Sequence, residues 1–312
     1  MHPLWNEWPP TGPMRKEQGH IAAGSWNIPA WMLSGAAPGK SVLVTAGVHG
    51  CEYPGIVAVM ELAAELDPAK MNGNVLFLAP VNISGFRDRL SELAAEDGKN
   101  LNRLFPGDPG GSPSEKVAAA LTSLHVRADF YLDLHSGDLH ENLRPFVFFP
   151  GIAEAGVVEA SRAAATVLDM DIRVRSGAST GAYNSAAIKG VPSLLIERGG
   201  LGVWTRPEVE AYKTDIRAVL AHLGVLPAGE GNPLPRPQRE ITSATYLEAD
   251  RAGCWFPAVH AGRRVRRGET LGEIRNFFGN VLAEYRAERD GEVLYLTVSL
   301  SVAANTPLVA YG

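Results

Sequence analysis

Residues 41–79 place the tightest restriction on the fold of this chain. Small and β-branched residues at 41–46 predict a buried strand, and apolar residues recur at helical spacing over 54–66 before an Asp-Pro pair ends the helix. An Asn-Gly turn signal then precedes a second predicted strand at 74–79. A strand, a helix and a strand in this order form a βαβ unit, which implies parallel strands and a right-handed crossover. The chain is therefore predicted to contain an α/β domain.

The turn after the first of these strands carries a histidine and a glutamate three residues apart, at 47–52. Both side chains are ligands that Zn²⁺ accepts. His135 follows a strand predicted at 130–134, and sites in open α/β sheets assemble at the carboxyl ends of strands. We therefore predict that His49, Glu52 and His135 hold one Zn²⁺ per chain with an open fourth position, which is typical of catalytic zinc. The alternative is that each histidine is an ordinary core or surface residue.

The rest of the chain up to residue 230 alternates strands and helices around a long irregular stretch, 82–113. A stretch of that length in a compact domain is usually functional. Ser114 is predicted to be the N-cap of the helix that follows it. The other predictions are an irregular lead-in over 1–17, a hairpin at 20–25 and 28–33, strands at 130–134, 146–149 and 192–196, and helices at 114–124, 154–168, 182–189 and 209–223.

The composition changes in residues 227–237, where four prolines and two glycines predict a linker or a stiff crossover. Short β-rich runs separated by glycine or charged turns then predict a small all-β domain over 238–312, so the α/β domain is assigned to 1–230. The small domain is similar to the barrel-sandwich hybrid of biotinyl and lipoyl carriers, but it contains no lysine to carry a cofactor. We expect it to be structural, to form a homo-oligomer or to act as a lid over the cleft.

A carboxylate at the end of another strand is a candidate general base. Glu197 follows the apolar run 193–196 and precedes two glycines, so it is expected to be desolvated near the metal. It would take a proton from water and pass it to a leaving amine. The alternative is that Glu197 pairs with Arg198 or caps a helix.

The irregular stretch also contains groups that suit an anion. Arg103 offers a planar fork for a carboxylate, and Asn102 adds amide donors beside it. Upstream, Arg87 or Arg89 would be placed to polarise a carbonyl and stabilise an oxyanion. The alternative is a solvated basic loop.

Composition limits the partners and the compartment. The net charge is −5 and the charges are interspersed, which gives no electrostatic support for binding to nucleic acid or to a membrane surface. The first residues contain no apolar run of the kind found in a signal peptide or a membrane span. The two cysteines lie far apart in the chain and form no disulfide framework. We therefore expect a cytoplasmic protein that acts on a small molecule.

Four motifs in this order resemble the succinylglutamate desuccinylase/aspartoacylase family, a branch of the zinc carboxypeptidase-like fold: Gly-Val-His-Gly-Cys-Glu, Asp-Gly-Lys-Asn-Leu-Asn-Arg-Leu-Phe-Pro-Gly, Asp-Leu-His-Ser-Gly and Ile-Glu-Arg-Gly-Gly. The resemblance spans about residues 18–312. It implies a zinc-dependent amidohydrolase that removes an acyl group from an N-acyl amino acid or a similar small amide. The matching residues are His49, Glu52 and His135 as zinc ligands, Glu197 as the catalytic carboxylate, Asn102 and Arg103 as the pair that binds a substrate carboxylate, and Arg89 or Arg87, with Arg89 preferred, as the oxyanion arginine.

The length and the second motif look closer to the branch that includes the N-acetyl-diaminobutyrate deacetylases of ectoine breakdown. No tyrosine of the small domain is matched to the substrate-contacting tyrosine of the aspartoacylase branch. Two other functions stay open: a metallocarboxypeptidase that acts on a small peptide, and a catalytically inactive protein that binds a metal and a ligand. Intact Glu197 argues against the inactive protein.

Overall fold

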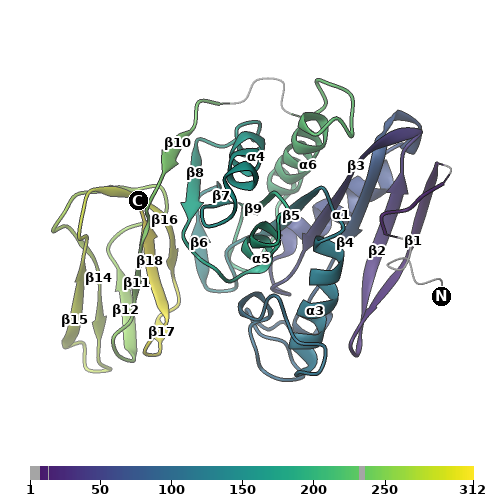
Figure 1. Ribbon diagram of the computed structural model, residues 1–312. Coiled ribbons are helices and arrows are strands. Elements are labelled where there is room, and N and C mark those ends of the chain that lie inside the picture. The colour runs from purple at the N-terminus through teal and green to yellow at the C-terminus, as the bar shows by residue number, and fades with distance from the viewer. Residues whose placement is uncertain (1–7, 13, 232–235) are drawn as a thin grey trace.

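The computed structural model describes residues 8–12, 14–231 and 236–312, and its larger part is built on one mixed sheet (Figure 1). In spatial order, its nine strands are β1 (Arg15–Ala23), β2 (Trp26–Ser34), β4 (Asn72–Leu78), β3 (Ala37–Ala46), β5 (Phe130–His135), β9 (Ser193–Glu197), β7 (Phe146–Pro150), β8 (Ile172–Ser176) and β10 (Arg239–Ile241). The β1–β2, β2–β4 and β7–β9 pairings are antiparallel and the other five are parallel. The predicted mixed, mostly parallel sheet is therefore confirmed.

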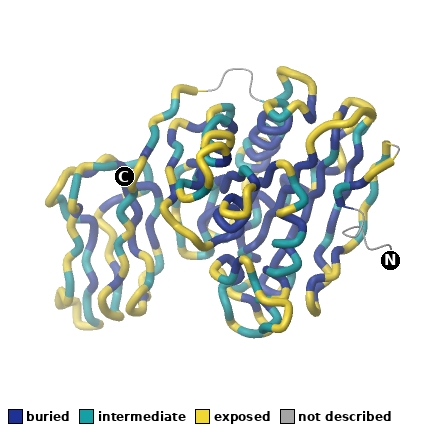
Figure 2. The backbone as a smooth tube through the Cα atoms, in the orientation of Figure 1, coloured by how far each residue is buried: buried dark blue, intermediate teal, exposed yellow. Residues whose placement is uncertain are grey.

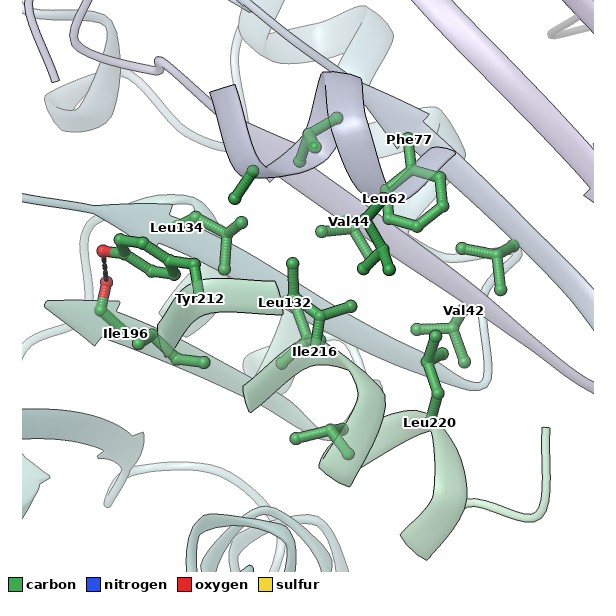
Figure 3. Packing of buried hydrophobic residues seen from close by; sticks show 14 of the residues in the cluster. Val42, Val44, Leu62, Phe77, Leu132, Leu134, Ile196, Tyr212, Ile216 and Leu220 are labelled. Carbon is green, nitrogen blue, oxygen red and sulfur yellow. Dashed lines mark hydrogen bonds between the residues drawn. The ribbon is translucent and has the colours of Figure 1, made fainter. Parts of the chain in front are cut away.

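Helices cover both faces of this sheet (Figure 1). Helices α1 (Tyr53–Glu65), α4 (Ala155–Ala165) and α6 (Arg206–His222) contribute to one buried cluster, and α3 (Pro113–His125) and α5 (Ala182–Ile188) contribute to the other. Figure 2 shows that the centre of the sheet is mostly buried, and Figure 3 shows the first cluster, in which Leu132 and Leu134 of β5 meet α6. Tyr131, the residue before Leu132, belongs to the second cluster, as the twofold alternation of a strand requires.

The predicted βαβ unit is present as β3, α1 and β4, with β3 parallel to β4. The predicted hairpin is also confirmed, because β1 and β2 pair along their whole length from Arg15↔Ser34 to Ala23↔Trp26. Its first strand starts inside the predicted lead-in over 1–17, of which residues 1–7 and 13 lie outside the described residues.

Two details of the predicted helices are wrong. The N-cap of α3 is Ser112, not Ser114, because a capping box joins Ser112 to Glu115. The hydroxyl of Ser114 instead donates to Asp97 at 2.7 Å. The stretch 82–113 is also not wholly irregular, since it contains the short helices α2 (Ile83–Asp88) and η3 (Leu101–Arg103); the remaining short helix, η2 (Pro68–Lys70), follows α1.

The C-terminal residues form two further antiparallel sheets, as the predicted all-β region requires. One contains β11 (Thr245–Glu248), β18 (Pro307–Tyr311), β16 (Gly291–Thr297), β13 (Arg264–Val265) and β6 (Glu141–Leu143), and the other contains β15 (Val281–Arg286), β14 (Thr270–Arg275), β12 (Gly253–Pro257) and β17 (Ser301–Val302). Strand β6 comes from the α/β part and pairs with β16, while β10 returns to the large sheet beside β8. Each part thus contributes one strand to a sheet of the other part, and these two pairings join the parts. The division at 227–237 stays a prediction, and residues 232–235 of that linker lie outside the described residues.

Within the described ranges, every helix is too short or too polar to cross a lipid bilayer.

Candidate active site

The candidate site lies at the carboxyl ends of three adjacent parallel strands. Strands β3, β5 and β9 are neighbours in the sheet, and β5 pairs with β9 so that His135 lies opposite Glu197. His49 follows the end of β3 on a turn that begins at Gly47, whose φ of +73° favours glycine. At Gly50, a side chain is excluded because a Cβ atom would lie 2.2 Å from the backbone nitrogen of Phe86. The absence of a side chain at Gly50 thus lets the turn pack closely against α2.

The structure brings the three predicted metal ligands together. The Glu52 carboxylate lies between the two imidazoles, with Oε1 2.7 Å from His49 Nδ1 and Oε2 2.9 Å from His135 Nδ1. One potential ligand atom from each residue lies within 4.8 Å of the others, so the cluster could hold one metal ion. Glu52 and His135 are buried and His49 is partly buried. The expectation that the two distant motifs face one crevice is therefore met.

The charges of Glu52 and of the two histidines favour each other's ionised forms. Burial alone would raise the pKa of Glu52, but the charges of His135 and His49 outweigh it and lower the pKa to about 2. Burial likewise opposes the charged form of His135, and the carboxylates of Glu52 and Asp133 raise its pKa well above the usual value.

A buried chain of polar groups lies behind His135. Asp133 Oδ2 lies 3.3 Å from His135 Nε2, and Asp133 Oδ1 accepts a hydrogen bond of 2.8 Å from the Thr45 hydroxyl. Because that hydroxyl donates its one proton to Asp133, the Tyr131 hydroxyl, 2.6 Å away, donates to Thr45. Thr45, Tyr131 and Asp133 have no solvent exposure. A carboxylate behind a histidine ligand fixes the orientation of the ring in metal sites.

Substituting Thr45 by Val keeps the shape of the side chain and removes its hydroxyl. We expect the free energy of unfolding to fall by about 1–3 kcal/mol, because Asp133 and Tyr131 each lose a partner in a buried place. Thr45→Ser keeps the hydroxyl and should cost only about 1 kcal/mol, the value of one buried methyl group. Urea unfolding monitored by fluorescence would measure both, and a Thr45→Val variant as stable as the unchanged protein would contradict the role assigned to the hydroxyl.

Glu197 meets the expectations for a desolvated carboxylate beside the metal ligands. Its Oε2 atom is buried and has no hydrogen-bond partner in the part of the chain that the structure describes. Burial raises the pKa of Glu197 well above the usual value; His135 opposes this effect, and the carboxylates of Glu52 and Glu141 add to it. A group in such surroundings stays available for proton transfer.

The alternative pairing of Glu197 with Arg198 is absent. The Arg198 guanidinium instead donates to Asp215 Oδ2 of α6 at 2.6 Å and to the backbone oxygen of Asp169 at 2.9 Å. The Arg198 backbone N–H donates to the Tyr212 hydroxyl at 3.0 Å. That hydroxyl also contacts the backbone oxygens of His135 and of Ile196, the second of which appears in Figure 3. Helix α6 therefore ties the ends of β5 and β9 together and leaves Glu197 free.

The site opens into a cavity of about 1090 Å³ that both predicted anion-binding residues line. Asn102 is buried, and its Oδ1 accepts a hydrogen bond of 2.9 Å from the backbone N–H of Ala182. Arg103 is exposed to the cavity, and it is the only arginine or lysine among the described residues that line it. Asn102 thus fixes the loop, and Arg103 presents a guanidinium to a ligand.

The two candidate oxyanion arginines lie elsewhere in this structure. Arg89 is the exposed C-cap of α2 in a left-handed conformation with φ of 56°, and it is not among the described residues that line the cavity. Arg87 lines a separate, smaller hollow beside Trp26 and Glu96. An oxyanion role for Arg89 stays a prediction.

Residues of the C-terminal sheets line the same cavity, although the sequence did not indicate which residues would do so. Tyr246 of β11 and Tyr295 of β16 face it, with ring centroids 6.4 Å apart. Glu141 at the start of β6 also lines it. Each lies on a strand of one sheet, and no local motif marks them. The pairing of β6 with β16 helps to bring them to the His49–Glu52–His135 cluster.

Comparisons with known proteins agree with this fold. The family model for the succinylglutamate desuccinylase/aspartoacylase catalytic domain matches residues 38–223. The chain is 30% identical over 289 residues to the N-alpha-acetyl-L-2,4-diaminobutyric acid deacetylase of Halomonas elongata, covering 86% of this chain and 81% of that protein.

Solved structures give the same result. A succinylglutamate desuccinylase/aspartoacylase from Rhodobacter sphaeroides is 28% identical, with a TM-score of 0.83 over 95% of each chain. The product-bound ectoine utilization protein EutE (DoeB) from Ruegeria pomeroyi is 26% identical, with a TM-score of 0.83 over 96% of this chain and 94% of that one. The fold and the ordered motifs define an α/β deacylase of the amide-hydrolysing class. The chain belongs to the succinylglutamate desuccinylase/aspartoacylase family.

Proposed function

We propose that the protein is a zinc-dependent deacylase, with the zinc carboxypeptidase-like fold, that hydrolyses the amide bond of an N-acyl amino acid. The observation that carries the proposal is the His49–Glu52–His135 cluster beside the unpartnered carboxylate of Glu197 in one cavity. Arg103 supplies a place for the substrate carboxylate in the same cavity. The two free cysteines agree with a cytoplasmic enzyme.

The donor set fits Zn²⁺ better than the hard cations, because two imidazoles and one carboxylate are borderline ligands in a small, closed cluster. His49 Nδ1, His135 Nδ1 and a Glu52 oxygen would hold the ion. Both rings have a polar atom at their other nitrogen: Asn100 Oδ1 lies 3.2 Å from His49 Nε2, and Asp133 lies behind His135. A bound Zn²⁺ would supply Lewis acidity toward water and a carbonyl oxygen.

Each remaining group has a role in the proposed reaction. Glu197 accepts a proton from water and delivers it to the leaving amine, for which an otherwise unpartnered carboxylate is suited. A cation in the cluster would favour the ionised form of Glu197 and offset its burial. Arg103 binds the substrate carboxylate as a forked donor, on a loop that Asn102 anchors.

The shape of the cavity favours small substrates. Strand residues of the C-terminal sheets, among them Tyr246 and Tyr295, line its wall, so a long peptide has less room than an N-acyl amino acid. The relative in Halomonas elongata is named for N-alpha-acetyl-L-2,4-diaminobutyric acid, and we propose that compound as the first substrate to test.

A hydrolysis screen tests the proposal. N-acetyl, N-succinyl and N-formyl amino acids, including Nα-acetyl-L-2,4-diaminobutyrate, and a set of dipeptides would be incubated with zinc-replete and with chelated protein, and released amine would be measured. We expect release from at least one N-acyl amino acid with zinc only. Release from dipeptides alone would establish a carboxypeptidase instead, and no release from any compound would refute the proposal.

A further inference from the structure

The carboxylates that line the cavity differ in whether the protein already pairs them. Asp138 has both oxygens bound, one by the Ser91 hydroxyl and one by the backbone N–H of His140 at 2.6 Å. Glu92 accepts a hydrogen bond of 2.8 Å from the amide of Asn100. Both carboxylates therefore already have hydrogen-bond partners within the cavity wall.

Glu141 is different. Its carboxylate contacts the backbone of Asp138 and has no ion pair with any residue that the structure describes, although it is half-buried in the wall of the cavity. Its position is fixed by the backbone, because Glu141 pairs with Thr297 of β16 and its carbonyl oxygen accepts from Leu201 N–H at 3.1 Å. A Cβ atom at Gly137 or Gly200 would lie 2.4 or 2.5 Å from that carbonyl, so glycine is required on both sides. The backbone thus holds a carboxylate without a cationic partner in the wall of the cavity.

The charges in the cavity are unequal. Arg103 is its one arginine or lysine among the described lining residues, and the proposed mechanism gives that cation to the substrate carboxylate. Glu197 serves as the base. Glu141 therefore remains as a half-buried carboxylate without a cationic partner, whereas Glu248, which also lines the cavity, is exposed to solvent. Burial, with the nearby charge of Asp138, raises the pKa of Glu141 to about 8, so its ionised form lacks a cation. A positive group on the ligand would supply it.

Resting on the proposed deacylase function, we infer that Glu141 is the specificity residue of this enzyme and binds a cationic group on the side chain of the N-acyl amino acid. The substrate class is then an N-acyl diamino acid, with its carboxylate on Arg103 and its free ammonium on Glu141. A dicarboxylic substrate, such as an N-acyl aspartate or glutamate, would place its second anion against Glu141 without a second cation to receive it. Like charges brought together in a desolvated place disfavour the wrong ligand strongly.

The experiment compares two substrates that differ only in the charged group. Values of kcat/KM would be measured for Nα-acetyl-L-2,4-diaminobutyrate and for Nα-acetyl-L-2-aminobutyrate, which lacks the side-chain amine, with the unchanged enzyme and with Glu141→Gln. We expect the unchanged enzyme to prefer the cationic substrate by about 30-fold or more, because removing one partner of a desolvated charge pair has an effect of that size. In Glu141→Gln the preference should fall to within a few-fold, through loss on the cationic substrate alone.

The neutral substrate shows whether the variant is still an intact enzyme. Glu248→Gln, which changes an exposed carboxylate of the same cavity, is the matched control and should keep the full preference. An equal loss on both substrates in Glu141→Gln, or an unchanged preference, would overturn the inference while leaving the deacylase function in place. Hydrolysis of no N-acyl amino acid by the unchanged enzyme would overturn the proposed function and this inference with it.

Discussion

Substitution of Glu197 by Gln is expected to lower kcat by about 10²–10⁴-fold, the usual contribution of a positioned general acid–base group. Gln keeps the size of the side chain but cannot take a proton from water or return one to the amine. Because Glu197 Oε2 has no hydrogen-bond partner among the described residues, the substitution breaks no bond within the protein. Steady-state hydrolysis of the best substrate from the screen would measure the loss.

Two controls separate a chemical effect from a structural one. The Glu197→Gln variant should bind zinc with the same stoichiometry as the unchanged enzyme, because the three ligands come from other positions, and its KM should change by far less than its kcat. Turnover within a few-fold of the unchanged enzyme would show that another group is the base.

Substitution of Asp215 by Ala is expected to lower the free energy of unfolding by about 3–5 kcal/mol, because it leaves the guanidinium of Arg198 buried without its counter-ion. Asp215 has no solvent exposure and Arg198 has 7%, and their side chains are joined at 2.6 Å. Arg198 directly follows Glu197, so activity at room temperature should fall as well when β9 loosens. Chemical denaturation would give the stability.

The double substitution of Arg198 by Met and Asp215 by Leu is the matched control for that prediction. It removes both charges and keeps apolar volume, and such replacements of buried ion pairs are often neutral or stabilising. We expect it to recover most of the stability lost in Asp215→Ala. If Asp215→Ala lowers the free energy of unfolding by less than about 1 kcal/mol, as the loss of a surface ion pair does, Arg198 must find another partner or water.

The parts of the site that could be predicted from sequence are those that follow strands along the chain. His49, His135 and Glu197 each stand at the end of an apolar run, and the parallel order of β3, β5 and β9 then brings them to one edge. Glu52 lies on the same turn as His49. Local pattern and the geometry of parallel sheets therefore suffice for the cluster.

The groups that escaped prediction depend on contacts between distant segments. Tyr295 and Glu141 reach the cavity because β6 leaves the α/β part and pairs with β16, about 150 residues further on, and no periodic signal announces a three-residue strand. The strand β8 was likewise missed, since it reads Ile-Arg-Val-Arg-Ser and looks polar, yet its two apolar side chains are buried against its neighbours. The predicted N-cap of α3 is wrong by two residues because serine is a favourable cap at both 112 and 114. Glu115 is the third helical residue after Ser112, so only Ser112 can form the capping box with it.

The central claim is that one metal ion, held by His49, Glu52 and His135, is needed for amide hydrolysis in this cavity. The most direct measurement is a titration of metal-free protein with Zn²⁺ while acetate release from Nα-acetyl-L-2,4-diaminobutyrate is followed by NMR. We expect the rate to rise in proportion to added zinc and to level off at one equivalent per chain, with Glu52→Ala inactive throughout. Full turnover by the metal-free protein, or no acetate release by the zinc-loaded protein, would contradict the claim.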